Sequence, residues 1–272
     1  MEEKKYEVNR KYDEKTLVNV LKNFDKAGEY VVEPGRNEIK RFEIDFENNL
    51  ENVNLKRKKH NKIDDLKNKK MINVKKFKRK DFITNFFYKF KGSKAKRSYE
   101  YAKKLLEYKI KTPEPIAYFD DFVNENNKKN SYYISEEMER MLSKVEKNRE
   151  KIIKQFAKFS FNLHENGVEF EDYSPGNVLI KDKSGNYEFY LVDLNRMKFN
   201  VKLNLNRRMK NVSRMMENEK IAKIFADEYA KCYKQREETV FRFLRYYIRK
   251  HKRYVDFMDI TRPFRNIFKR KK

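Results

Sequence analysis

The chain has 272 residues, enough for one large domain or for two lobes with buried cores. Aromatic residues make up 15% of it, which excludes a disordered chain although 40% of the residues are charged. Lysine and arginine outnumber the acids 67 to 42, and the net charge of +25 favours a polyanionic partner such as nucleic acid, an anionic membrane face or a phosphorylated glycolipid. The chain is rich in Lys and Asn throughout, so biased composition is an alternative source of part of this charge.

Other classes of protein are excluded by what the sequence lacks. Cys232 is the single cysteine, so an internal disulfide or a multi-cysteine metal site cannot form. The first fifteen or so residues have no apolar segment typical of a signal peptide, and no run of about 18 apolar residues occurs. We therefore expect a cytoplasmic protein, either free or peripheral to the membrane.

The first half of the chain predicts a small antiparallel sheet with one crossing helix. A short amphipathic helix is expected within residues 12–26, where Leu17, Val20, Leu21 and Phe24 recur at helical spacing. The strand signals are GEYVVE and EIKRFEIDF around the turn PGRN, then MINVKKF, TPEPIAYFDDF and SYYISEEME. The crossing helix is SKAKRSYEYAKKLLEYKI, with Ser93 as its N-cap and an apolar stripe from Ala95 to Leu106. The polar residues 47–70 predict an exposed loop.

The second half is predominantly helical. EKIIKQFAKFSFNLHENG places Ile152, Phe156, Phe159 and Leu163 on one helix face, and Gly167 suits the position just past the helix end. Two short strands, NVLI and YEFYLVDL, follow around the turn KDKSGN, and helices are expected from about residue 205 onward. The boundary is expected after residue 138, giving lobes 1–138 and 139–272.

The central motif is Asp172-Tyr173-Ser174-Pro175-Gly176-Asn177, followed by Asp193 at the end of a hydrophobic strand. Phosphoryl transfer from ATP needs one carboxylate to take the acceptor's proton, and a second carboxylate with an amide to hold magnesium. Protein kinases place these groups in H-R-D-L-x-x-x-N and D-F-G, with the same Asp-to-Asn interval. Each match alone is equally compatible with turn residues and a strand-end cap, but their order across a two-strand unit favours a kinase.

A kinase also needs a strand lysine that binds phosphate and a helix glutamate that holds this lysine. Lys75 in INVKKF is the candidate lysine, on the same strand face as Asn73 and Phe77, with Lys76 on the opposite face. Glu100 is the candidate glutamate. An exposed basic strand and an ordinary surface glutamate are the alternatives in so lysine-rich a chain.

The glycine-rich loop of kinases is missing between the first two strands, where EPGRNEIK contains only Gly35. Backbone binding of phosphates would be poorer there. Arg36 or Lys40 could supply a point charge instead.

Several stretches together resemble the lipopolysaccharide kinase (Kdo/WaaP) family over about residues 28–215. They include TPEPIAY, LHENGVEFEDYSPGNVLI and YEFYLVDLNRMKF, of which SPGN and VDLNRM are the most specific. The resemblance implies a two-lobed α+β protein-kinase-like fold, with a small antiparallel-sheet N-lobe and a mostly helical C-lobe. It also implies phosphorylation of a lipopolysaccharide inner-core sugar, Kdo or heptose, or of a related envelope glycolipid, with ATP and Mg²⁺ at the cytoplasmic face of the inner membrane.

Carried over to this sequence, the resemblance implies Asp172 as the catalytic base and Asn177 and Asp193 as Mg²⁺ ligands. It implies Lys75 and Glu100 as the phosphate-binding pair, and a hinge near Glu136–Met138 that binds adenine through backbone groups. The chain departs from the kinase pattern where Phe170-Glu171 replaces His-Arg and where Asn195 replaces the glycine of D-F-G. There is also no A-P-E segment, which argues against a docked protein substrate.

The C-terminal residues 242–272 contain twelve basic and two acidic residues among aromatic ones. Their tail, RPFRNIFKRKK, is a candidate contact with an anionic membrane surface. A nucleic-acid-binding module is the alternative for the basic surface, although no recognised nucleic-acid motif is present. A protein kinase-like enzyme and a pseudokinase remain alternatives to the sugar kinase, and the sequence indicates no oligomeric state.

Overall fold

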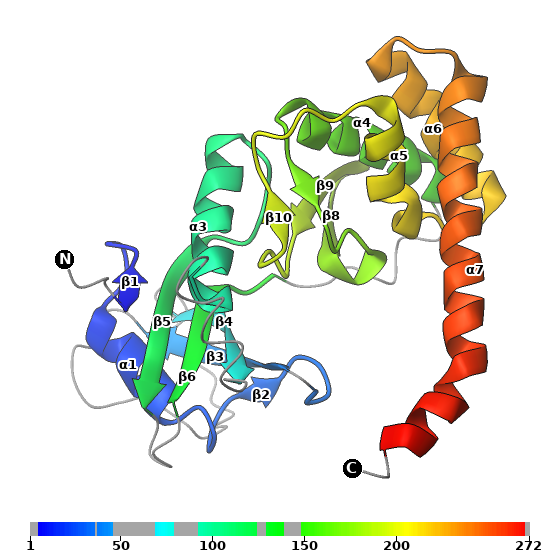
Figure 1. Cartoon of the computed structure of the whole chain (residues 1–272). Coiled ribbons are helices and arrows are strands. Elements are labelled where there is room, and N and C mark those ends of the chain that lie inside the picture. The colour runs from blue at the N-terminus through cyan, green and yellow to red at the C-terminus, as the bar shows by residue number, and fades with distance from the viewer. Residues whose placement is uncertain are drawn as a thin grey trace. The chain divides into compact units, whose positions relative to one another are not determined.

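The computed structural model describes residues 5–35, 37–45, 69–78, 92–123, 129–138 and 148–269, with side chains as far as residue 261. The chain divides into two compact units, Met1–Glu139 and Arg140–Lys272 (Figure 1). We describe each unit by itself. The predicted loop 47–70 lies outside the described residues, apart from its last two residues, which begin a strand. Arg36 and Phe46 also lie outside the described residues.

Unit 1 is built on a six-stranded sheet in the order β1-β5-β6-β4-β3-β2, in which every neighbouring pair is antiparallel. The strands are β1 (Tyr6–Val8), β2 (Glu29–Tyr30), β3 (Asn37–Asp45), β4 (Lys69–Lys78), β5 (Pro115–Val123) and β6 (Lys129–Glu136). Among the described residues of this unit, the helices are α1 (Glu14–Lys22) and α3 (Lys94–Glu107). The predicted small antiparallel sheet is confirmed.

The alternation of side chains along β4 assigns one helix to each face of the sheet. Ile72 and Val74 are buried in the cluster formed with α1, whereas Phe77 is buried in the cluster formed with α3. Figure 1 shows α1 and α3 on opposite sides of the strands. Because successive side chains of a strand point to opposite faces, the two helices contact alternate residues of one strand.

Helix α1 forms because its start is capped and its apolar positions share one face. The Asp13 carboxylate accepts a hydrogen bond from the Thr16 backbone N–H at 2.8 Å, which satisfies one of the unpaired amides of the first turn. The predicted apolar side chains are fully buried: Leu17, Val20, Leu21 and, just beyond the helix, Phe24. The Phe24 ring contacts those of Phe42 and Tyr132 at 6.0 and 5.5 Å between centroids.

Helix α3 follows the predicted pattern as well. Ser93 is its N-cap and accepts a hydrogen bond from the Lys96 N–H at 2.9 Å. The buried stripe includes Ala95, Tyr99, Ala102 and Leu105, and Leu106 is half-buried.

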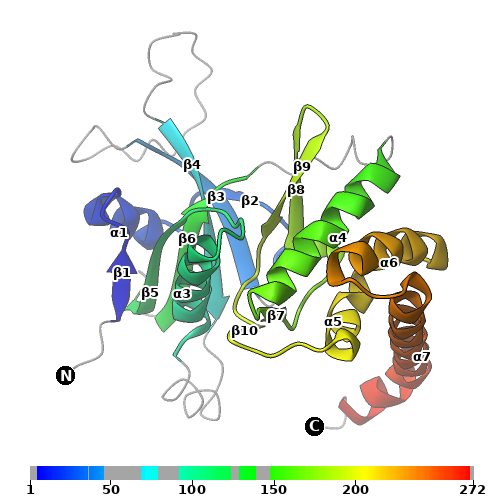
Figure 2. The ribbon, with the colours of Figure 1, turned by 90° about the horizontal axis from the view of Figure 1, so that it is seen from above.

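The described part of unit 2 contains four α-helices, one short hairpin (β8–β9) and a second strand pair, β7 with β10. The helices are α4 (Arg149–Glu165), α5 (Leu205–Val212), α6 (Glu219–Tyr233) and α7 (Glu237–Lys269), with 3-10 turns at Pro175–Asn177 and Ser213–Met215. The strands are β7 (Glu169–Phe170), β8 (Val178–Lys183), β9 (Asn186–Leu191) and β10 (Met197–Lys198). Figure 2 shows β8 and β9 beside α4.

Phe156 of α4 is the centre of the aromatic core of unit 2. Its ring lies 5.7 Å from that of Tyr173, 5.3 Å from that of Phe189 and 5.9 Å from that of Phe225. The core therefore joins α4 to the loop that follows β7, to β9 and to α6. The helix face predicted from the sequence is the one that the structure buries.

Two glycines act where their backbone conformation requires them. Gly167 follows α4 with φ +65°, and a Cβ there would come within 3.1 Å of the Val201 amide nitrogen. Ser184 and Gly185 both have positive φ at the β8–β9 turn, the conformation of a type I′ hairpin. No helix among the described residues is long and apolar enough to cross a membrane.

We expect Phe24→Ala to destabilise unit 1 by about 3–5 kcal/mol, because the substitution leaves a cavity between α1 and the sheet. Unfolding in urea followed by circular dichroism measures this loss, since the chain has no tryptophan. Val123→Ala, at an exposed strand end, is the matched control and should change stability by less than about 0.5 kcal/mol. Equal effects of the two substitutions would contradict this description of the core.

Candidate active site

Two antiparallel pairings enclose the segment that carries Asp172, Asn177 and Asp193. On one side β7 pairs with β10, with Phe170 opposite Met197. On the other side β8 pairs with β9, with Val178 opposite Leu191. Asp172, Asn177 and Asp193 each lie within two residues of a paired strand position. The pairings therefore bring two carboxylates that are far apart in sequence into one region.

Two backbone hydrogen bonds extend these pairings to the predicted residues themselves. The Glu171 N–H donates to the Arg196 carbonyl at 3.0 Å, and the Val192 N–H donates to the Asn177 carbonyl at 3.0 Å. The second bond sets Asp193 directly beside Asn177.

The Asn177 side chain closes the loop that begins at Asp172. Its Nδ2 donates to the Asp172 carbonyl at 2.9 Å. Since this bond uses the amide nitrogen, Oδ1 is the atom that Asn177 can offer to a cation.

Asp193 has a left-handed backbone, with φ +58°. Such a conformation is uncommon outside glycine, although Asp and Asn tolerate it. The Asn195 Nδ2 donates to the Asp193 Oδ1 at 2.6 Å. Asn195, which stands where kinases have the glycine of D-F-G, thus helps to orient the carboxylate.

The Asp172 carboxylate has a partner that the sequence did not indicate. Arg214, in the 3-10 turn after α5, donates from Nη1 to the Asp172 Oδ1 at 3.1 Å. Both side chains are partly exposed, Asp172 at 30% and Arg214 at 40%. The spacing of 42 residues follows no local motif, so only the fold brings the two together.

A chain of polar side chains, partly or fully buried, holds the backbone two residues before Asp172. The Asn211 Nδ2 donates to the Phe170 carbonyl at 2.7 Å, and its Oδ1 lies 3.2 Å from the His164 Nε2. Because Oδ1 only accepts, Nε2 carries the proton. The His164 Nδ1 therefore accepts from the Tyr229 hydroxyl at 2.8 Å. The chain of bonds links α4, α5 and α6 to Phe170.

His164 works in this chain as a neutral ring. Burial lowers the pKa of His164 to about 3, an effect that the hydrogen bond to Asn211 opposes and that the nearby charge of Arg208 reinforces. His164 packs at the end of α4, where its side chain is buried.

Lys75 lies in unit 1 on the face of β4 that carries α3. Its Nζ is 5.2 Å from the centre of the Phe77 ring, and Phe77 packs against α3. Lys76 points to the other face, where its Nζ donates to the Asp25 Oδ1 at 2.6 Å. The alternation thus separates the two lysines as the sequence predicts.

Glu100 has an ion-pair partner on its own helix. Its carboxylate is half-exposed and pairs with Lys96 of the same helix at 3.9 Å. Lys103, one turn further on the same side of α3, pairs with Glu7 of β1 at 2.8 Å. This pair joins α3 to β1, the strand at the sheet edge beyond β5. The position of Glu100 is that of a surface glutamate, the alternative interpretation given above for this residue.

Lys40 is likewise occupied elsewhere. Its Nζ donates to the Phe24 and Ala27 carbonyls at 2.8 and 3.0 Å, near the end of α1. Burial lowers the pKa of Lys40, and the nearby acid Asp25 opposes this shift. The lysine stabilises the α1 end, so the sequence-based suggestion that it replaces the glycine loop is not supported.

The predicted hinge begins at the last residue of β6. The Glu136 and Glu137 amides donate to the carbonyls of Glu114 and Met71 at 2.9 and 3.0 Å. The Glu136 carboxylate accepts from Tyr12 at 2.7 Å and from Lys70 at 3.2 Å. Burial works against its ionisation, but these two bonds outweigh it and lower the pKa of Glu136.

A family model, the lipopolysaccharide kinase (Kdo/WaaP) family, matches residues 51–247, which is well over half of the chain. The chain belongs to this family. It is therefore a kinase-type phosphotransferase of the lipopolysaccharide kinase family, and such kinases use ATP.

Comparison with solved structures confirms the kinase-like α+β fold of the family. A structure of WaaP in complex with acyl carrier protein is similar, with a TM-score of 0.54 and 15% identity, over 90% of this chain and 93% of that one. The bifunctional kinase-methyltransferase WbdD also matches, with a TM-score of 0.37 and 15% identity, over 68% of this chain and 42% of that one. A search of curated proteins finds no match.

The oxygen donors near Asp172 suit the divalent cation that family kinases use. Asn177 and Asp193 offer an amide oxygen and a carboxylate, which are hard ligands of the kind that Mg²⁺ prefers. Within the described part of the chain, no three His, Cys, Asp or Glu side chains gather as a metal site. Mg²⁺ in kinases is usually held by one or two protein ligands together with substrate phosphates, so a two-residue set fits.

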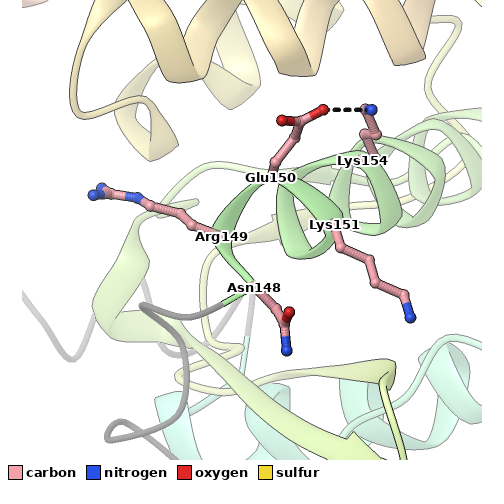
Figure 3. A pocket seen from close by; sticks show the side chains of 5 residues that line it. All are labelled: Asn148, Arg149, Glu150, Lys151 and Lys154. Atoms are coloured by element: carbon pink, nitrogen blue, oxygen red, sulfur yellow. Dashed lines mark hydrogen bonds and ion pairs between the residues drawn. The ribbon is translucent and has the colours of Figure 1, made fainter.

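A separate hollow of unit 2 lies at the start of α4 and has a volume of about 380 Å³. It is lined by Asn148, Arg149, Glu150, Lys151 and Lys154, all from one helix end (Figure 3). Glu150 is bonded to Lys154 at 2.6 Å. None of the predicted site residues lines this hollow.

The neutral state of His164 predicts a specific pH dependence of stability. A folded pKa of about 3 lies below the unfolded value of about 6.5, so the unfolded chain binds the extra proton between these values. The stability that His164 contributes is complete above about pH 6.5 and falls as the pH drops toward 3. Between pH 7.5 and 5.5 we expect the wild type to lose about 1.4 kcal/mol through this residue.

Urea unfolding of the wild type and of His164→Gln at pH 7.5 and 5.5 measures this contribution as the difference between their pH-dependent losses. The His251→Gln variant, which changes a histidine on α7, is the control and should keep the wild-type dependence. An identical pH dependence in all three proteins would show that His164 is not buried in the neutral form.

Proposed function

We propose that this chain transfers the γ-phosphoryl group of ATP to a sugar hydroxyl, Kdo or heptose, of the lipopolysaccharide inner core or of a related envelope glycolipid. The observation that carries the proposal is the pair of strand pairings that brings Asp172, Asn177 and Asp193 together. Family membership supports the same chemistry. The site of action proposed is the cytoplasmic face of the inner membrane.

Asp172 is proposed as the base. Its carboxylate would accept the proton of the sugar hydroxyl and orient the attacking oxygen. The 30% exposure of the side chain leaves room for an acceptor to approach. The bonds that fix Phe170 and Asn177 on either side of Asp172 keep the carboxylate in place, which is the usual requirement for a positioned base.

Asn177 and Asp193 would hold Mg²⁺, with the Asn177 Oδ1 and the Asp193 carboxylate as ligands. When bound, the cation neutralises charge on the phosphates as the phosphoryl group is transferred. The Asn195 amide would keep the Asp193 carboxylate turned toward the ion.

Lys75 and the end of β6 would bind the rest of the nucleotide. Lys75 is proposed to contact its phosphates as a point charge. The Glu136 and Glu137 amides are used by the sheet, so adenine would bind the Glu136 carbonyl and the Met138 amide. The Met138 side chain adds partly buried apolar surface at the same place.

The reaction predicts a large effect of substitution at both aspartates. We expect Asp172→Ala to lower kcat by about 10²–10⁴-fold, because the base is lost, and Asp193→Ala to abolish measurable turnover. The assay measures ATP turnover with purified lipid A–core acceptors that carry Kdo, heptose or both. Asp182→Ala, in the β8–β9 hairpin, is a matched control that removes a carboxylate from the same unit.

The competing functions give different results in the same assay. Turnover that survives both substitutions would overturn the assignment. Nucleotide binding without turnover on any glycan acceptor would indicate a pseudokinase, and turnover on a protein acceptor a protein kinase-like enzyme. A thermal shift with RNA, but not with ATP and Mg²⁺, would favour the nucleic-acid-binding module.

Helix α7 supports an additional proposal, contact with an anionic membrane surface. Its first half packs in unit 2 through Val240 and Leu244, which are fully buried. Beyond them the helix exposes Tyr246, Tyr254, Phe257 and Ile260, of which Phe257 is 62% and Ile260 69% exposed. Figure 1 shows this half of α7 continuing past α5 and α6.

The same side of α7 carries positive charge. At 100° per residue, Tyr246, Phe257 and Ile260 lie within one third of the helix circumference. Lys250 and Arg253 lie on the same third. Exposed aromatic and aliphatic side chains interleaved with cations are typical of helices that lie on anionic lipid. The side chains of the tail 262–272, where the sequence predicts this contact, lie outside the described residues.

We expect the double substitution Phe257→Ser and Ile260→Ser to weaken binding to phosphatidylglycerol-containing vesicles by about tenfold or more, since two apolar side chains no longer insert. Cosedimentation with these vesicles and with phosphatidylcholine vesicles measures the change. Val255→Ser, on the opposite side of α7, should bind as the wild type does. Wild-type binding that is absent, or that ignores lipid charge, would refute the contact.

A further inference from the structure

The loop that carries the proposed base contains acids and no bases. Residues 168–177 read VEFEDYSPGN, with three carboxylates and neither lysine nor arginine. A site that receives the phosphates of ATP beside these carboxylates needs positive charge from another part of the chain.

Each of the three acids is paired with a cation from residues 198–214. Glu169 binds Arg207 through two hydrogen bonds of 3.0 and 2.6 Å. Glu171 pairs with Lys198. Asp172 accepts one hydrogen bond from Arg214 at 3.1 Å.

The pairs of Glu169 and Asp172 differ in kind. Glu169 is largely buried, and the two bonds from Arg207, together with its charge, lower the pKa of Glu169 although burial opposes this. This is a structural ion pair with the planar geometry that arginine and carboxylate favour. Arg214 instead makes a single bond to Asp172 and remains 40% exposed, so most of its five N–H donors are not used by Asp172.

The backbone around Arg214 is nevertheless well anchored. Val212, Ser213 and Met216 are buried, and the Ser213 hydroxyl donates to the Lys210 carbonyl at 2.9 Å. A 3-10 turn flanked by the buried Val212 and Met216 therefore presents an arginine whose head group is held at one point by the proposed base. This combination of a fixed backbone and a partly free guanidinium suits the binding of a transient anion better than it suits a structural pair.

We propose that Arg214 is a catalytic residue that binds the transferred phosphoryl group while it orients Asp172. The inference rests on the proposed function. As the acceptor oxygen bonds to the γ-phosphorus, its proton passes to Asp172 and the bond from the γ-phosphorus to the β–γ bridging oxygen breaks, releasing ADP. Arg214 neither gains nor loses a proton. Its remaining N–H groups bind the phosphoryl oxygens, where negative charge is spread during transfer.

The experiment compares binding of Mg²⁺·ATP and Mg²⁺·ADP by calorimetry, without acceptor, because only ATP carries the group that Arg214 is proposed to contact. For Arg214→Ala we expect ATP affinity to fall about tenfold or more and ADP affinity to change little. Arg214→Lys should recover part of the ATP affinity, because the charge is kept and the fork is lost. With lipid A–core acceptor, kcat of Arg214→Ala should fall about 10²–10³-fold.

Lys210→Ala is the matched control, since it removes one positive charge a single turn earlier without a contact to Asp172. It should keep the wild-type ratio of ATP to ADP affinity, and a melting temperature equal to that of wild type shows that each variant is folded. An unchanged ratio in a folded Arg214→Ala would overturn the proposal, even if kcat falls. A rise in acceptor KM alone would also overturn it, since Arg214 would then bind an acidic group of the acceptor.

Failure of the proposed function has a different signature. In that case the wild type itself shows no nucleotide binding or no turnover, whatever residue stands at position 214. Wild-type turnover combined with an unchanged ATP-to-ADP ratio in Arg214→Ala would leave the phosphotransferase intact and remove only the role of Arg214.

Discussion

The antiparallel pairing of two strand couples is the constraint on which the second unit depends. Residue 170 lies opposite 197, and residue 178 lies opposite 191, so the β8–β9 hairpin is nested between the paired strands β7 and β10. Although Asp172 and Asp193 are far apart in sequence, they lie in one region because backbone hydrogen bonds of the paired strands fix both ends of the segment between them. The same pairings explain why the loop can be short and polar, since its backbone bonds are satisfied at its two ends.

Buried polar side chains extend this rigidity without adding charge. A buried imidazolium beside Arg208 would be expensive, whereas a neutral His164 accepts from Tyr229 and donates to Asn211 with both nitrogens used. Asn211 then binds the Phe170 carbonyl, two residues before the proposed base. Each member of the chain of bonds has a partner on another helix, which makes the position of the loop a property of the whole helical packing.

Periodic patterns predicted most of the fold, and single long-range side-chain contacts escaped prediction. Helical spacing identified the buried faces of α1, α3 and α4, and strand alternation separated Lys75 from Lys76, because burial acts on whole faces. Glu100 shows the limit, since a residue at the margin of a helix face can turn toward either edge of the sheet. The Asp172–Arg214 contact joins residues 42 apart, and no periodicity relates them.

The distribution of charge around the proposed site residues differs between the two units. In unit 1 the sequence lacks a glycine-rich loop, Lys40 supports the end of α1 and Glu100 pairs with Lys96 of its own helix. In unit 2 every acid of the loop around Asp172 has a cation from residues 198–214. Anion binding that backbone amides and a lysine–glutamate pair provide in other kinases can thus be supplied here by arginine. A guanidinium carries its charge at any pH and binds phosphate through a preformed fork, so it needs no partner to keep it ionised.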